Sequence, residues 1–162
     1  MNTLLKTTLR MHTPSAVQDV VLLVVRLGLG GVLIAHGWQK LDEQGLSGTA
    51  AGFDGMGIPL PELAAHFATW VELVGGGLLI AGFLTPLVGL LVVGDMAGAF
   101  WYAHRDAGVF AAEGGWELVL MIALLALALV ATGAGRLSVD GFIAGGRRRE
   151  DPVASEPEKV NA

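Results

Sequence analysis

The run VVLLVVRLGLGGVLIA, residues 20–35, decides the fold class of this chain. Fifteen of its sixteen residues are apolar or glycine, and only Arg26 is charged. A run of this kind approaches the ~20 residues that a helix needs to cross the hydrocarbon core of a bilayer. It is longer than the apolar core of a usual signal peptide, and His36 and Trp38 follow it rather than a small-residue cleavage site. We therefore interpret residues 16–37 as a retained membrane span.

Three more apolar stretches of near-span length follow the first. Pro61 suits the first turn of a helix, where its missing N–H costs nothing. The link Thr85-Pro86 is so short that the helices on either side of it should be antiparallel neighbours. No continuous helix is expected through the glycine- and proline-rich connection 41–61. The sequence thus predicts an all-α fold, an integral membrane four-helix bundle, whose further spans cover residues 61–83, 86–104 and 115–132.

Charge is scarce in this chain. Charged residues make up 15% of the 162, against roughly 25% in an ordinary soluble domain. The chain has no cysteine, which excludes thiol nucleophiles, disulfides and cysteine-bound metal clusters. Lys and Arg do not gather into the broad basic face that nucleic-acid binding requires. The predicted partner is therefore the lipid bilayer, and nucleic acid is not one.

The distribution of Lys and Arg predicts the topology. The loops after the first and third spans hold only Lys40 and Arg105. Because positive residues flank the cytoplasmic ends of spans, both termini are expected in the cytoplasm. The expected organisation is a cytoplasmic N-terminal segment, 1–15, a four-span domain, 16–143, and a disordered cytoplasmic tail, 144–162. The positive residues on the cytoplasmic side would be Lys6, Arg10, Arg136, Arg147, Arg148, Arg149 and Lys159.

Glycines are dense within the predicted spans and permit the close contact on which helix association in lipid depends. They are Gly28, Gly30, Gly31, Gly75, Gly76, Gly77, Gly82, Gly89, Gly94 and Gly98. Gly94 and Gly98 form a small-xxx-small pair, as do Gly77 and Ala81. Because helix association in lipid depends on close contact, we expect these pairs to lie where helices pack together.

Ionisable residues inside the spans are the first candidates for a site. Arg26, Glu72 and Asp95 each lie near the middle of a span, and Glu117 lies at the start of the last one. A charge near the bilayer centre costs at least ~2.5 kcal/mol, so each should face the bundle interior and find a partner. We expect Arg26 and Glu72 to pair at similar depth. Such a pair is either a structural link that fixes helix register or a buried site for a proton, quinone or anion.

A second group of candidates lies near the predicted outer surface. Each predicted helix carries a His, a Trp or a carboxylate at this end: His36, Glu62, His66, Trp70, Trp101, His104, Trp116 and Glu117. One interpretation is an aromatic belt with interfacial histidines. The other is a site that transfers protons or binds a cofactor, with Trp70, Trp101 and His104 as cofactor-binding candidates. No pair has a diagnostic metal-ligand spacing, so no metal site is predicted.

Three segments together resemble one known family. They are RLGLG at 26–30 followed by HGWQKL at 36–41, then ELVGG at 72–76, then GAGRLSVD at 133–140. In this order and spacing they resemble the DoxX family of bacterial and archaeal membrane proteins over residues 19–142. The resemblance implies a four-helix protein of the bacterial inner membrane. The family positions matched here are Arg26, His36, Lys40, Glu72 and Glu117.

The resemblance also implies a redox association. Relatives are linked to thiosulfate–quinone oxidoreduction, and a mycobacterial member to a membrane complex with superoxide dismutase and a sulfurtransferase. The leading hypothesis is a redox subunit of thiosulfate:quinone type that passes electrons through a bound quinone. In it Arg26 would bind an anion or a quinone oxygen, and Glu72 and His36 would carry protons. Glu117 completes the set of catalytic candidates.

Two other hypotheses stay open at this point. The chain could be a non-catalytic scaffold whose cytoplasmic tail recruits soluble redox enzymes. It could also be a small-solute or proton pathway, for which so short a chain would need to form a homo-oligomer. Whether the protein is itself an enzyme is not decided by its sequence.

Overall fold

The computed structural model describes residues 15–150, and this part of the chain is almost entirely helical with no β-strand. The predicted all-α fold is confirmed. In chain order the helices are α2 (Ser15–Trp38), the π-helix η1 (Gln39–Glu43), α3 (Gly45–Gly55), α4 (Pro61–Ala81), α5 (Thr85–Ala99), the π-helix η2 (Phe100–His104), the 3₁₀ helix η3 (Ala111–Glu113), α6 (Glu117–Thr132) and α7 (Val139–Glu150).

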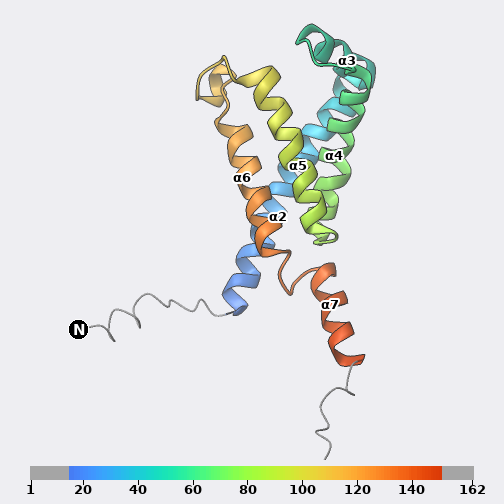
Figure 1. Ribbon diagram of the computed structural model, residues 1–162, viewed down its shortest axis with the longest axis vertical. Coiled ribbons are helices and arrows are strands. Elements are labelled where there is room, and N and C mark those ends of the chain that lie inside the picture. The colour runs from blue at the N-terminus through green and yellow to red at the C-terminus, as the bar shows by residue number, and fades with distance from the viewer. Residues whose placement is uncertain (1–14, 151–162) are drawn as a thin grey trace, which may run out of the picture.

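Four of these helices form a bundle (Figure 1). α2 packs along α4, α4 packs against α5, and α5 packs along α6. Large apolar side chains also cover much of the outside, among them Val24, Leu90 and Leu124, as expected for helices that face hydrocarbon. The core holds Leu29, Leu33, Val71, Leu79, Val88, Val92, Met96, Val119, Ile122, Ala126 and Leu129.

The predicted spans agree with the helices to within a few residues. Three helical segments of the described part are long and apolar enough to cross a membrane, at residues 16–43, 61–81 and 85–104. The fourth, α6, is apolar but has only 16 residues. At 1.5 Å per residue it is about 24 Å long, less than the ~30 Å hydrocarbon core. The chain therefore has three to four helices that could span a bilayer.

The two ends of the bundle differ in what they contain. We call the end with the start of α2, the α4–α5 turn and the end of α6 the tail end. The opposite end, with α3, both π-helices and η3, is the loop end, at the top of Figure 1.

Glycines bring helices together at some of the predicted positions, among them Gly30, Gly76 and Gly89, but not at the two predicted small-xxx-small pairs. A Cβ on Gly30 would lie 2.5 Å from the carbonyl oxygen of Gly76, and one on Gly37 would lie 2.6 Å from the backbone N of Leu73. These contacts join α2 to α4, and Gly89 similarly meets α6. A Cβ on Gly77, Gly94 or Gly98 would meet nothing within 4 Å. The expectation that the Gly94–Gly98 and Gly77–Ala81 pairs hold these helices together is therefore wrong.

As expected, no continuous helix runs through the connection 41–61, whose helical course is broken near Gly45 and Gly57, both with positive φ. The sequence analysis did not anticipate the shorter helix α3 within it, which packs against α4. The tail was expected to lose regular structure from residue 144, but α7 continues to Glu150. The rest of that predicted tail, 151–162, and most of the predicted N-terminal segment lie outside the described residues.

Candidate functional site

Arg26 and Glu72 do not form the predicted pair. The Arg26 side chain is fully buried and donates to the carbonyl oxygens of Leu79 (3.3 Å), Ile80 (2.9 Å) and Leu137. The last carbonyls of a helix lack partners within the helix and carry partial negative charge, so they suit a guanidinium. Arg26 thus binds the tail end of α4, whereas Glu72 lies two turns nearer the loop end. The prediction that Arg26 and Glu72 lie at a similar depth in the bundle is therefore also wrong.

The segment GAGRLSVD closes the tail end around Arg26. Its Asp140 carboxylate accepts hydrogen bonds from the backbone N–H groups of Leu84 (2.9 Å) and Thr85 (3.0 Å), at the start of α5. The Asp140 N–H donates to the carbonyl oxygen of Gly82 at 2.9 Å. We call Arg26, Gly82 and Asp140, with the backbone groups they bind, the clasp. A negative charge at a helix N-terminus and a positive charge at a helix C-terminus both stabilise the fold.

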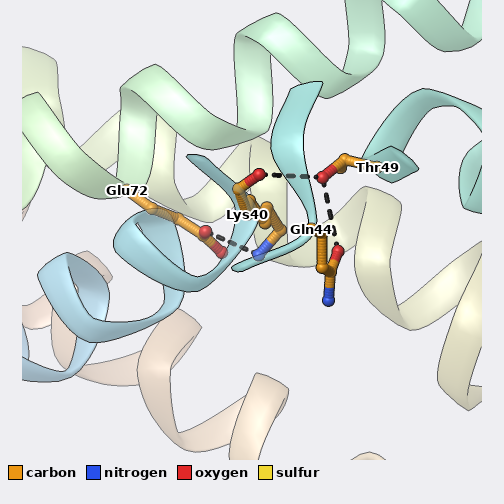
Figure 2. A network of polar contacts seen from close by, with 4 residues as sticks. All are labelled: Lys40, Gln44, Thr49 and Glu72. Carbon is orange, nitrogen blue, oxygen red and sulfur yellow. Dashed lines mark hydrogen bonds and ion pairs between the residues drawn. The ribbon is translucent and has the colours of Figure 1, made fainter. Parts of the chain in front are cut away.

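Glu72 instead pairs with Lys40 near the loop end. Lys40 Nζ lies 2.6 Å from Glu72 Oε2, and their side chains are only 19% and 6% exposed. Lys40 belongs to η1, whose backbone is tied to α3: the Thr49 hydroxyl lies 3.1 Å from the Lys40 carbonyl oxygen and 3.3 Å from Gln44 Oε1. Figure 2 shows this network of four residues. The ion pair is therefore held by α3 as well as by α4.

A cavity of about 260 Å³ adjoins this ion pair. Its walls come from α3, α4, α5 and the segment before α4, as well as from the two π-helices. Asp95 on α5 also lines it, and the Asp95 Oδ2 atom is buried without a hydrogen-bond partner in the described part of the chain. The cavity therefore combines one ammonium with two carboxyl groups. Most of its other lining is apolar or aromatic: Phe53, Met56, Ile58, Phe67, Ala68, Ala99 and Tyr102.

Both π-helices border the cavity. In η1 the N–H of Gln44 donates to the Gln39 carbonyl oxygen, and in η2 the N–H of Arg105 donates to that of Phe100, each a five-residue step. Such wide turns reorient the side chains that follow and are frequent at functional sites. Here they carry Lys40 and, on η2, Tyr102 and His104. The helical segments that begin with α2 and α5 thus depart from regular α geometry at their loop ends, where η1 and η2 supply the cavity, whereas α4 supplies it from a regular α-helix.

Two of the seven predicted site residues line the cavity, Glu72 and His104. His104 Nδ1 also lies 2.6 Å from the carbonyl oxygen of Gly114. His36 is half-buried on α2, one turn before Lys40, and is not part of the lining.

The other predicted site residues lie elsewhere. Glu117 Oε1 accepts a hydrogen bond from the Ala111 N–H at 2.7 Å, which braces the loop before α6. Trp70 and Trp101 are about half exposed on the outside of the bundle, and the Arg105 guanidinium lies 4.7 Å from the centroid of the Trp101 ring. These positions suit an aromatic belt better than a shared cofactor site. Within residues 15–150 no group of three or more His, Asp and Glu residues is placed to hold a metal.

Sequence reasoning named Lys40 and Asp95 without recognising that they share a cavity with Glu72. Lys40 follows a tryptophan at the end of a span, which is also the usual place of an interfacial anchor. The signal that could have found the cavity is the apolar trio Phe53, Met56 and Ile58 in an otherwise polar connection. All three contribute to the cavity wall.

Comparison with known proteins places the cavity within a recognised family. The DoxX family model matches residues 21–105, which include Lys40, Glu72 and Asp95. The chain is 30% identical over 130 residues to the Bacillus subtilis (strain 168) protein named "Putative oxidoreductase CatD", covering 80% of this chain and 92% of that one. It is 32% identical over 139 residues to the "Inner membrane protein YphA" of Escherichia coli (strain K12), covering 82% and 97%. No solved structure matches the chain. The chain is a membrane protein of the DoxX family.

Proposed function

We propose that this protein is a redox-associated subunit of the bacterial inner membrane that binds a quinone ring in the cavity beside Lys40 and Glu72. The observation that carries the proposal is a buried ion pair next to a carboxyl without a partner, in a wall that is otherwise apolar and aromatic. Ionisable residues within membrane segments are costly and are retained chiefly for function. The name of the Bacillus relative adds support for redox chemistry.

The size and lining of the cavity favour a ring with polar edges. Its volume of about 260 Å³ is slightly below the ~300 Å³ at which small-molecule pockets begin. It therefore suits a headgroup whose apolar tail remains in lipid. Phe67 and Tyr102 line the cavity and are also exposed on the outside of the bundle, so the cavity wall is continuous with the lipid-facing surface.

The polar groups supply what quinone reduction requires of a protein. Reduction to the quinol takes two electrons and two protons. The Lys40 ammonium would donate a hydrogen bond to one quinone oxygen, and the carboxyls of Glu72 and Asp95 would pass protons to the ring. The electrons would come from the redox centre of a partner enzyme that oxidises a small sulfur compound. Arg26 lies at the other end of α4, so it is assigned a structural role instead of its predicted role at the ring.

The proposed orientation places both termini in the cytoplasm, because the tail-end segments carry most of the Lys and Arg. The cavity would then lie toward the periplasmic side. A reporter that is active only in the cytoplasm should be active when fused to the C-terminus. A reporter that is active only in the periplasm should be inactive there, and activity of that fusion would contradict this orientation.

Direct binding tests the quinone proposal. The full chain in lipid nanodiscs should bind a short-chain ubiquinone or menaquinone in calorimetric titration. Asp95→Leu should weaken binding at least tenfold, because it removes a hydrogen-bonding group from the cavity without removing the ion-pair partner of Lys40. The matched control is Asp106→Leu, at an exposed carboxylate on the loop beyond η2. Absence of quinone binding by the unaltered protein, or equal weakening by both variants, would overturn the proposal.

A further inference from the structure

Helix α7 lies outside the four-helix bundle, at the end of the described chain. Figure 1 shows it at the tail end, beyond the α4–α5 turn. In the described part of the chain it makes no extensive contact with any other helix. Its first turn is nevertheless fixed in place, because Asp140 binds the start of α5 and the Phe142 N–H donates to the Ser138 carbonyl oxygen at 3.0 Å.

The beginning of α7 exposes a cluster of apolar side chains. Phe142 is 83% exposed, and Leu137, Val139 and Ile143 are exposed as well. Positions 139, 142 and 143 share one face of a helix. The clasp holds this face at the level where α4 ends and α5 begins, which is the level at which the membrane-spanning segments end. Apolar groups held at that level meet the boundary between headgroups and acyl chains.

The first charged residues after the apolar turn are basic, and acidic residues begin again only at Glu150. Between Asp140 and Glu150 the sequence of α7 contains no acidic residue, and it contains Arg147, Arg148 and Arg149 in succession. A helix with an apolar face and clustered arginines is typical of segments that lie in a membrane interface and attract anionic lipids. A water-exposed helix would gain nothing from the exposed Phe142.

We infer that α7 is an interfacial helix that binds anionic lipid headgroups at the tail end of the bundle. Leu137, Val139, Phe142 and Ile143 enter the interface, and the net positive charge of the sequence between Asp140 and Glu150 favours anionic headgroups there. The clasp sets the depth, because it joins the first turn of α7 to the transmembrane helices. This inference is independent of the quinone proposal, since it involves no residue of the cavity.

Site-directed spin labelling tests the position of α7, and the absence of cysteine makes each introduced label unique. Phe142→Cys reports on the apolar face. Ala144→Cys is the matched control, because it is also exposed and lies about 200° away around the helix. The full chain is reconstituted in vesicles of phosphatidylcholine with phosphatidylglycerol. Collision with oxygen, which dissolves in lipid, and with a water-soluble nickel chelate is then measured at each label.

We expect the label at 142 to collide roughly fivefold less with the nickel chelate than the label at 144, as for the two faces of an interfacial helix. Replacing phosphatidylglycerol by phosphatidylcholine, or introducing R147Q, R148Q and R149Q together, should raise the chelate accessibility of position 142. Equal chelate accessibility at both positions in the anionic vesicles would overturn the inference and favour a helix that projects into water to meet a protein. If the label at position 142 were equally inaccessible to the nickel chelate in vesicles without anionic lipid, the proposed preference of α7 for anionic headgroups would be overturned.

Discussion

The clasp and the cavity both bury charged groups, but they satisfy them differently. Arg26 is surrounded by backbone carbonyl oxygens and by a motif that returns from the end of the chain to cover it. The cavity holds one ammonium against two carboxyls, and Asp95 Oδ2 lacks a partner among the described residues. Arg26 Nε also lacks a hydrogen-bond partner in the described part of the chain, but the other two nitrogens of its guanidinium are bound by fixed backbone carbonyls. A charge held mainly by fixed backbone groups stabilises a fold, whereas an unmatched carboxyl that lines a cavity is available to a ligand. The comparison therefore supports a structural role for the clasp and the ligand role proposed for the cavity.

The largest loss of stability is expected for Arg26→Leu. It leaves the carbonyl oxygens of Ile80 and Leu137 without the Arg26 donor, at about 1–3 kcal/mol for each unsatisfied group, whereas the Leu79 carbonyl keeps the N–H of Gly82. A total of roughly 4 kcal/mol should appear as a lower unfolding temperature in detergent. Arg105→Leu, at an exposed position of the loop end, is the control and should change little. If the two variants were equally stable, the clasp would not have the structural role assigned to it.

The next largest effect is expected for Glu72→Leu, because it leaves Lys40 buried without a partner. Removing one member of a buried ion pair costs about 3 kcal/mol. The double variant Lys40→Met with Glu72→Leu should recover most of that loss, since no uncompensated charge remains. Stability of the four proteins in a double-mutant cycle measures the coupling. The same cycle with Arg26→Leu in place of Lys40→Met should show no coupling to Glu72, and strong coupling there would restore the pair first expected from the sequence.

The sequence was sufficient to predict the membrane-spanning helices, because the length of an apolar stretch is a property of that segment alone. It was not sufficient for the partner of Glu72, because that depends on how helices rotate and slide against one another. Arg26 and Glu72 have opposite charge and similar distance from the ends of their spans, so they appeared to be partners. The residue types in a sequence do not show which backbone carbonyls lie near Arg26. In the structure the carbonyls at the end of α4 bind Arg26 in place of Glu72. The π-turn that carries Lys40 has no sequence signal that we could use.

A smaller effect on stability should distinguish glycines at helix contacts from glycines without a close neighbour. Gly30→Ala should destabilise the protein by about 2 kcal/mol, because the added methyl group meets the Gly76 backbone and forces α2 away from α4. Gly94→Ala is the matched change in α5, where a Cβ meets nothing within 4 Å. It should leave the unfolding temperature unchanged. Equal destabilisation by both would mean that the Gly94–Gly98 pair packs against a helix after all, for example in a second copy of the chain.

The smallest effect on stability, and the most informative for function, is expected for Asp95→Asn. Asparagine has nearly the same shape, and no hydrogen bond to Asp95 Oδ2 is lost. The free energy of unfolding should therefore change by less than about 1 kcal/mol. If the cavity transfers protons to a quinone, the same variant should still lose quinone reduction, because an amide cannot deliver a proton. A loss of activity without a loss of stability is what separates a ligand site from a structural ion cluster. A variant that is as stable and as active as the unaltered protein would remove Asp95 from the site and leave Lys40 and Glu72 as a structural ion pair.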